Sequence, residues 1–164
     1  LDDTDLVVCL DALAGRWGTT ESLPLESIRW QADLLSGRGS ARVRRAAAQA
    51  VENVWSPMET RLRLLLVASG FPAGIANMQL VDPDTHQVFY LDIAYPRWRI
   101  AIEFDGDSHR TDRAQWQRDL HKNHVLHAAG WTVLRISSAD LRDPQRFLRR
   151  LSAAITRAGK PRSG

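Results

Sequence analysis

Hydrophobic and polar residues alternate along three stretches in the middle of the chain, and this period of two is typical of β-strands. The stretches are 75–81, 87–94 and 98–105. Asp-Pro-Asp-Thr-His at 82–86 predicts a hairpin connection between the first two. A fourth strand is predicted at 131–137, where the adjacent Val133 and Leu134 indicate that both faces are covered, as in a central strand.

Elsewhere apolar residues recur every three or four positions, which predicts helices. The helical stretches are 4–14, 21–35, 41–55, 57–70, 112–129 and 144–157. Glycine and serine at 36–40 form the clearest break in this pattern. At the start of the fourth helix, Ser56, Pro57 and Glu59 have the spacing of a capping box.

The order of these elements is helix, three-strand meander, helix, strand, helix. It predicts an α/β fold, with a mixed central sheet of about four strands flanked by helices and a small helical segment before it. We therefore expect two parts, a helical N-terminal segment at 1–39 and an α/β domain at 40–164.

Acidic side chains stand on the predicted strands where a buried sheet favours apolar residues. A two-residue loop at Arg97 and Trp98 would place Asp92 directly across from Glu103, with Cβ atoms about 5 Å apart. Asp105 shares the face of Glu103 by strand parity. Like charges this close repel unless a cation holds them. The pattern predicts a divalent-metal site, and the oxygen ligands favour Mg²⁺ or Mn²⁺ over Zn²⁺.

Structural explanations compete with this interpretation. Glu59 could serve only as the capping-box acid, and Asp105 could simply begin the turn at Gly106. Asp92 could pair with Arg99 instead. Glu103 is harder to explain structurally, because strands disfavour glutamate and its neighbours are apolar.

Charge is distributed unevenly along the chain, whose net charge is +3. Residues 1–34 carry seven acids and two arginines, whereas residues 35–164 carry 20 basic and 12 acidic residues. This basic segment predicts a polyanion partner, although a solvated surface would look the same. The arginines expected to contact nucleic acid are Arg42, Arg44, Arg45, Arg97, Arg110 and Arg113. No apolar run is long enough to span a membrane, and a single cysteine, Cys9, suits a reducing cytoplasm.

The motifs together resemble a known group. Asp92, the Glu-Phe-Asp-Gly run at 103–106, His109 and Gly-Trp-Thr-Val-Leu-Arg at 130–135 are similar to the very-short-patch-repair (Vsr)-like endonuclease relatives of the PD-(D/E)XK superfamily, over about residues 56–157. The resemblance implies a restriction-endonuclease-like fold and a DNA substrate. It implies that Asp92 and Glu103 are the principal metal-binding acids, that Glu59 is an accessory acid, that Asp105 and His109 complete the site, and that Asp119 and Lys122 face it.

One position departs from the superfamily pattern, because its usual lysine two residues after the second acid is here Asp105. Three alternatives follow: Lys122 takes that role, His109 transfers the proton, or the site is inactive. The leading hypothesis is a Mg²⁺-dependent endodeoxyribonuclease. The alternatives are an inactive nucleic-acid-binding module, or a toxin–antitoxin component whose helical segment at 1–55 masks the DNA surface.

Overall fold

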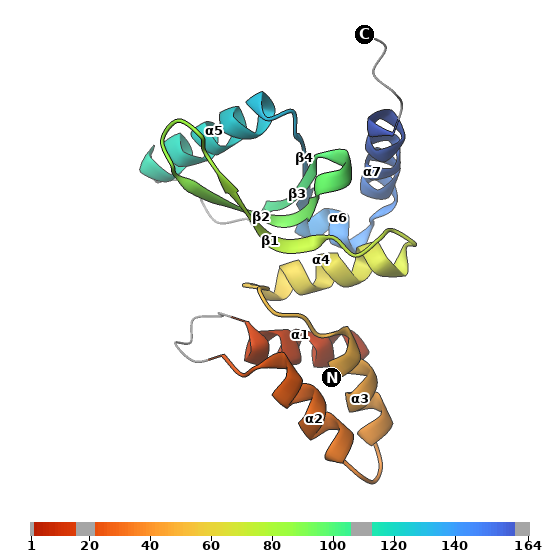
Figure 1. Cartoon of the computed structure of the whole chain (residues 1–164). Coiled ribbons are helices and arrows are strands. Elements are labelled where there is room, and N and C mark those ends of the chain that lie inside the picture. The colour runs from red at the N-terminus through yellow and green to blue at the C-terminus, as the bar shows by residue number, and fades with distance from the viewer. Residues whose placement is uncertain (1, 16–21, 106–112, 160–164) are drawn as a thin grey trace. The chain divides into compact units, whose positions relative to one another are not determined.

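The computed structural model describes residues 2–15, 22–105 and 113–159 (Figure 1). The chain divides into two compact units, Leu1–Ala68 and Ser69–Gly164. The domain boundary expected after residue 39 stays a prediction.

The first unit is helical. Its helices are α1 (Asp3–Ala14), α2 (Leu25–Leu34), α3 (Ser40–Gln49) and α4 (Pro57–Ala68). Val7, Ile28, Ala46 and Leu62 bury their side chains in its core. Gly15 ends α1, where an added Cβ would lie 2.3 Å from the carbonyl oxygen of Val54, so only glycine fits this approach.

A buried carboxylate links three segments of this unit. Asp11 is fully buried on α1. It accepts hydrogen bonds from the Val51 backbone N–H at 2.8 Å, the Thr60 hydroxyl at 2.8 Å and the Arg63 guanidinium at 2.9 Å. Because a buried charge is stable only when it is paired and hydrogen-bonded, these contacts connect α1 to α4 and to the segment before it.

The second unit is an α/β fold with a four-stranded mixed sheet flanked by helices, as predicted. Its elements are β1 (Ile75–Val81), β2 (Val88–Tyr95), the 3₁₀ helix η1 (Pro96–Trp98), β3 (Ile100–Asp105), α5 (Arg113–Ala128), β4 (Thr132–Ser137), α6 (Ser138–Arg142) and α7 (Gln145–Ala158). The strand order is β1-β2-β3-β4, antiparallel except for the parallel pair β3–β4. In the described sheet β4 is therefore an edge strand, and the prediction of a central strand was wrong. Figure 1 shows α5 and α7 on either side of β4.

The turn between β2 and β3 differs from the expected two-residue loop. The register matches the prediction, since Ile93 pairs with Ile102 and Tyr95 pairs with Ile100. Four residues make the connection: η1, which begins at Pro96, and Arg99 at φ 49°. Proline has no N–H to donate to a strand ladder, and its fixed φ suits the first residue of a helical turn.

Apolar side chains from the sheet and α5 form one core cluster. Leu91, Ala94 and Ala101 pack there with Leu126 of α5, and all four are fully buried. On α7, Phe147, Leu151 and Ala154 recur at helical spacing and are also buried. This packing fixes the middle of β2 and β3, from which the acidic side chains project.

Candidate active site on the second unit

Asp92 and Glu103 meet where the pairing of β2 with β3 stops. The last backbone pair is Ile93 with Ile102. Beyond it, the Phe104 backbone N–H donates to Asp92 Oδ2 at 2.7 Å. The Glu103 carboxylate in turn accepts from the backbone N–H of Asp92. Both carboxylates thus accept a hydrogen bond from a backbone N–H group at this point, and they lie together at one place on the sheet.

Lys122 reaches this place from α5. Its Nζ donates to Glu103 Oε2 at 2.6 Å and to the Tyr90 carbonyl oxygen at 2.6 Å. Both side chains of the ion pair are 19% exposed. The other carboxylate oxygen, Glu103 Oε1, is buried and has no hydrogen-bond partner among the described residues. A buried carboxylate oxygen in that state is a candidate ligand atom.

Burial sets the protonation behaviour of Glu103. Desolvation raises its pKa above the ordinary value, and the ammonium of Lys122 and the N–H of Asp92 oppose this shift without cancelling it. A further cation placed against Glu103 would therefore stabilise the ionised form of its carboxyl group.

The expected set of three carboxylates is not assembled. Among residues 2–15, 22–105 and 113–159, no group of three or more His, Cys, Asp or Glu side chains is placed to hold a metal ion. Asp105 ends β3, where it is half-buried and in register with Ser137. Asp92 and Glu103 still offer hard oxygen donors, and Mg²⁺ commonly uses one or two carboxylates together with waters and substrate phosphates. The donor set thus fits the ion, and its binding stays a prediction.

The other predicted catalytic residues lie in different surroundings. Glu59, in the first unit, forms half of the predicted capping box, since its backbone N–H donates to the Ser56 hydroxyl oxygen at 3.2 Å. Its carboxylate accepts from the Ser56 hydroxyl and from the Trp55 backbone N–H, both at 2.9 Å. Asp119 is half-buried on α5. His109 and Arg110 lie outside the described residues, and so does the side chain of Arg113.

Two of the predicted nucleic-acid contacts have intramolecular partners. On α3, Arg42 forms an ion pair with Asp3, and Arg44 donates to the Leu35 carbonyl oxygen at 2.8 Å. These contacts explain why arginines occur in the first turns of a helix, where the macrodipole disfavours them. Arg45 is exposed. Arg97 is exposed in the second unit, with its guanidinium 5.7 Å from the centre of the Trp98 ring.

One further polar contact, which the sequence did not predict, involves the residue before Lys122 on α5. His121 Nε2 lies 2.8 Å from Asp82 Oδ2, which joins the β1–β2 hairpin to α5. Asp82 is buried and also accepts from Thr85 and from the Asp84 backbone N–H, so its pKa falls to about 2. The only local signal was an aspartate at the start of a turn.

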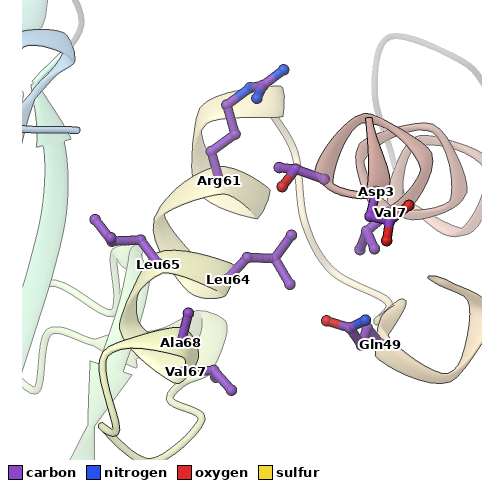
Figure 2. Close-up of a pocket in the computed structure, with 9 residues that line it drawn as sticks. Asp3, Val7, Gln49, Arg61, Leu64, Leu65, Val67 and Ala68 are labelled. Atoms are coloured by element: carbon purple, nitrogen blue, oxygen red, sulfur yellow. The ribbon is translucent and has the colours of Figure 1, made fainter. Parts of the chain in front are cut away.

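A hollow of about 410 Å³ in the first unit offers no comparable chemistry (Figure 2). Leu64 and Val7 contribute to its mostly apolar lining, and Figure 2 shows Leu64 pointing toward α1. Its two charged residues are already paired, Asp3 with Arg42 and Arg61 with Asp5. The carboxylates of the second unit remain the better candidate.

Comparisons with known proteins cover this same region. The family model REase_MTES_1575 matches residues 79–155, from within β1 to within α7. Two uncharacterized proteins of Mycobacterium tuberculosis, MT2308 of strain CDC 1551 / Oshkosh and Rv2248 of strain ATCC 25618 / H37Rv, are each 28% identical over 105 residues. The alignment covers 63% of this chain and 38% of each relative. No solved structure gives a significant match.

No helix among the described residues combines the length and apolarity that crossing a bilayer requires. The matched region contains Asp92, Glu103 and Lys122. Residues 79–155 of the second unit are thus similar to the family model REase_MTES_1575.

Proposed function

We propose that the second unit is a metal-dependent endonuclease that hydrolyses phosphodiester bonds in DNA. The observation that carries the proposal is the Glu103 carboxylate, with one oxygen paired to Lys122 and the other buried without a partner among the described residues. The match to a restriction-endonuclease-like family supports the reaction class. The similarity to Vsr-like enzymes in particular is part of the proposal.

Asp92 and Glu103 would hold Mg²⁺ or Mn²⁺ through their carboxylate oxygens. A divalent ion bound there would lower the pKa of a coordinated water and stabilise negative charge on the phosphate. The protein would keep Glu103 ionised through Lys122 and would keep Asp92 in place through the Phe104 N–H.

Lys122 would replace the lysine that the superfamily carries at the position of Asp105. Its ammonium already lies beside the second acid, 2.6 Å from Glu103 Oε2, although it comes from α5 instead of β3. In that position it would offer positive charge to the phosphate as negative charge builds up during hydrolysis. His109 stays a candidate for proton transfer.

The test is a plasmid-nicking assay with the purified chain in Mg²⁺ or Mn²⁺. Asp92→Ala and Glu103→Ala should each lower the nicking rate by on the order of 100-fold, because each removes a metal ligand. Asp84→Ala is the matched control, since it removes an exposed acid from the hairpin. Nicking by both site variants at the parental rate would refute the assignment.

The second candidate function is a nucleic-acid-binding module without turnover. It is favoured by Asp105, which stands where the superfamily carries its lysine. Salt-sensitive DNA binding without cleavage in either metal would support it.

A further inference from the structure

A second hollow, whose lining is mostly polar, lies at the turn end of the sheet. Its volume is about 380 Å³, and η1, the start of β4 and the end of α7 line it. Three lining residues are arginines, Arg97, Arg99 and Arg157, and none is acidic. Glu103 lies farther along β3, about 13 Å from Arg99 at the usual rise of a strand. The hollow is therefore separate from the carboxylate site.

Two of the guanidinium groups are held in place. Arg97 lies over the Trp98 ring at 5.7 Å, and Trp98 is itself 5.6 Å from the Tyr95 ring in an edge contact. Arg99 donates to the Ala129 carbonyl oxygen at 3.1 Å. An added Cβ at Gly130 would lie 3.2 Å from that guanidinium. Groups fixed in this way lose little conformational entropy when a ligand binds.

Helix ends explain only part of this positive charge. Carbonyl groups at a helix C-terminus attract arginine, and Arg99 satisfies one at the end of α5. Among the described residues, however, the guanidinium groups of Arg97 and Arg157 make no ion pair and no hydrogen bond, and both residues are exposed. Like charges gathered in a hollow repel one another and concentrate a positive potential there. A bound anion would relieve this repulsion.

We propose that this hollow binds a backbone phosphate of nucleic acid, at a distance from the carboxylate site. Guanidinium groups match the geometry of phosphate oxygens and bind them through two parallel hydrogen bonds. The half-buried Trp98 supplies an apolar face beside them for a sugar or base. The step of about 13 Å to Glu103 equals roughly four nucleotides of rise along B-DNA. The choice of nucleic acid as the phosphate source rests on the proposed function, whereas the preference for an anion does not.

The experiment measures binding of a fluorescein-labelled DNA duplex to the full chain in EDTA, over a series of salt concentrations. The double variant Arg97→Gln/Arg157→Gln should bind on the order of tenfold more weakly. Its salt dependence should be shallower by about 0.9, the value for one lost phosphate contact. The matched control is Arg146→Gln/Arg149→Gln, which removes two exposed arginines of α7 outside the hollow. An equal loss in both double variants would overturn the proposal.

A second arm separates nucleic acid from free phosphate. Inorganic phosphate is titrated into the wild-type chain while the indole N–H signal of Trp98, assigned by its loss in Trp98→Phe, is followed by NMR. A shift of this signal, combined with wild-type duplex affinity in Arg97→Gln/Arg157→Gln, would assign the hollow to free phosphate and overturn the proposal. Binding is measured in EDTA, where cleavage cannot occur, so its result does not depend on the nuclease proposal. A chain that binds DNA through the hollow but does not cleave it in Mg²⁺ or Mn²⁺ would refute the nuclease proposal and leave the phosphate site standing.

Discussion

Lys122 on α5 and Glu103 on β3 form a half-buried ion pair, with Nζ 2.6 Å from Oε2. The pair places a cation beside Glu103, whereas the strand position two residues further on is the acidic Asp105. Helix α5 connects β3 to the parallel strand β4, and its Lys122 side chain reaches Glu103 on β3. A crossover helix can therefore supply charge that the strand itself lacks.

Lys122→Met should separate catalysis from DNA binding. Methionine has a similar length but no charge, so the nicking rate should fall by on the order of 100-fold, the usual cost of losing one group that stabilises transition-state charge. Duplex affinity measured in EDTA should change little, because one half-buried lysine already paired with Glu103 contributes little to the external field. Nicking by Lys122→Met at the wild-type rate would show that the ion pair is structural only.

Asp92→Asn should separate metal binding from folding. The asparagine side-chain oxygen can still accept from the Phe104 N–H, so the melting temperature should stay close to that of the wild type. The lost negative charge should weaken Mn²⁺ binding by at least about tenfold, measured by titration calorimetry. Asp92→Leu is the comparison, since it also loses the hydrogen bond and should melt at a lower temperature. Equal Mn²⁺ affinity in Asp92→Asn and the wild type would remove Asp92 from the metal site.

Local patterns predicted most of the second unit. Strand alternation gave β1 with its observed bounds and placed β2, β3 and β4 within two residues, and it gave the β2–β3 register. The geometry of the turn was missed because two-residue hairpins are the commonest short connections, whereas Pro96 favours a helical turn. The five-residue α6 was also missed, because it is too short to show a helical period; its signal was the capping box of Ser137 with Asp140.

The candidate site was only partly predictable. Strand parity brought Asp92 and Glu103 together, but it could not show that backbone pairing ends beside them and that their side chains take backbone N–H groups there. Contacts between residues distant in sequence were the hardest to predict. Asp11 meets Thr60 and Arg63, which lie 49 and 52 residues away, and an isolated acid on a helix gives no sign of burial.

Asp82→Asn should destabilise the chain at neutral pH but not in strong acid. Because its folded-state pKa is lowered to about 2, from 3.8, the ionised Asp82 contributes stability above pH 4. That contribution is lost as the pH falls through 2. Urea unfolding should therefore show a deficit for Asp82→Asn at pH 6 that narrows toward pH 2. The control Asp84→Asn, an exposed acid of the same hairpin, should show no comparable pH trend. A deficit independent of pH would mean that the hydrogen bonds of Asp82 do not depend on its charge.

Asp11→Ala should be among the most destabilising substitutions in the first unit. It removes the acceptor for Thr60 and Val51 and leaves the Arg63 guanidinium, whose side chain is 8% exposed, without its partner carboxylate. Breaking a buried ion pair by removing one partner typically costs about 3–5 kcal/mol, because the remaining charge is not compensated. The control is Asp5→Ala, which breaks the more exposed pair with Arg61 and should cause a much smaller loss. Equal losses in the two variants, measured by urea unfolding, would show that burial does not determine the strength of these ion pairs. Restoring stability with Asp11→Ala/Arg63→Met would in turn show that the uncompensated guanidinium carries most of the cost.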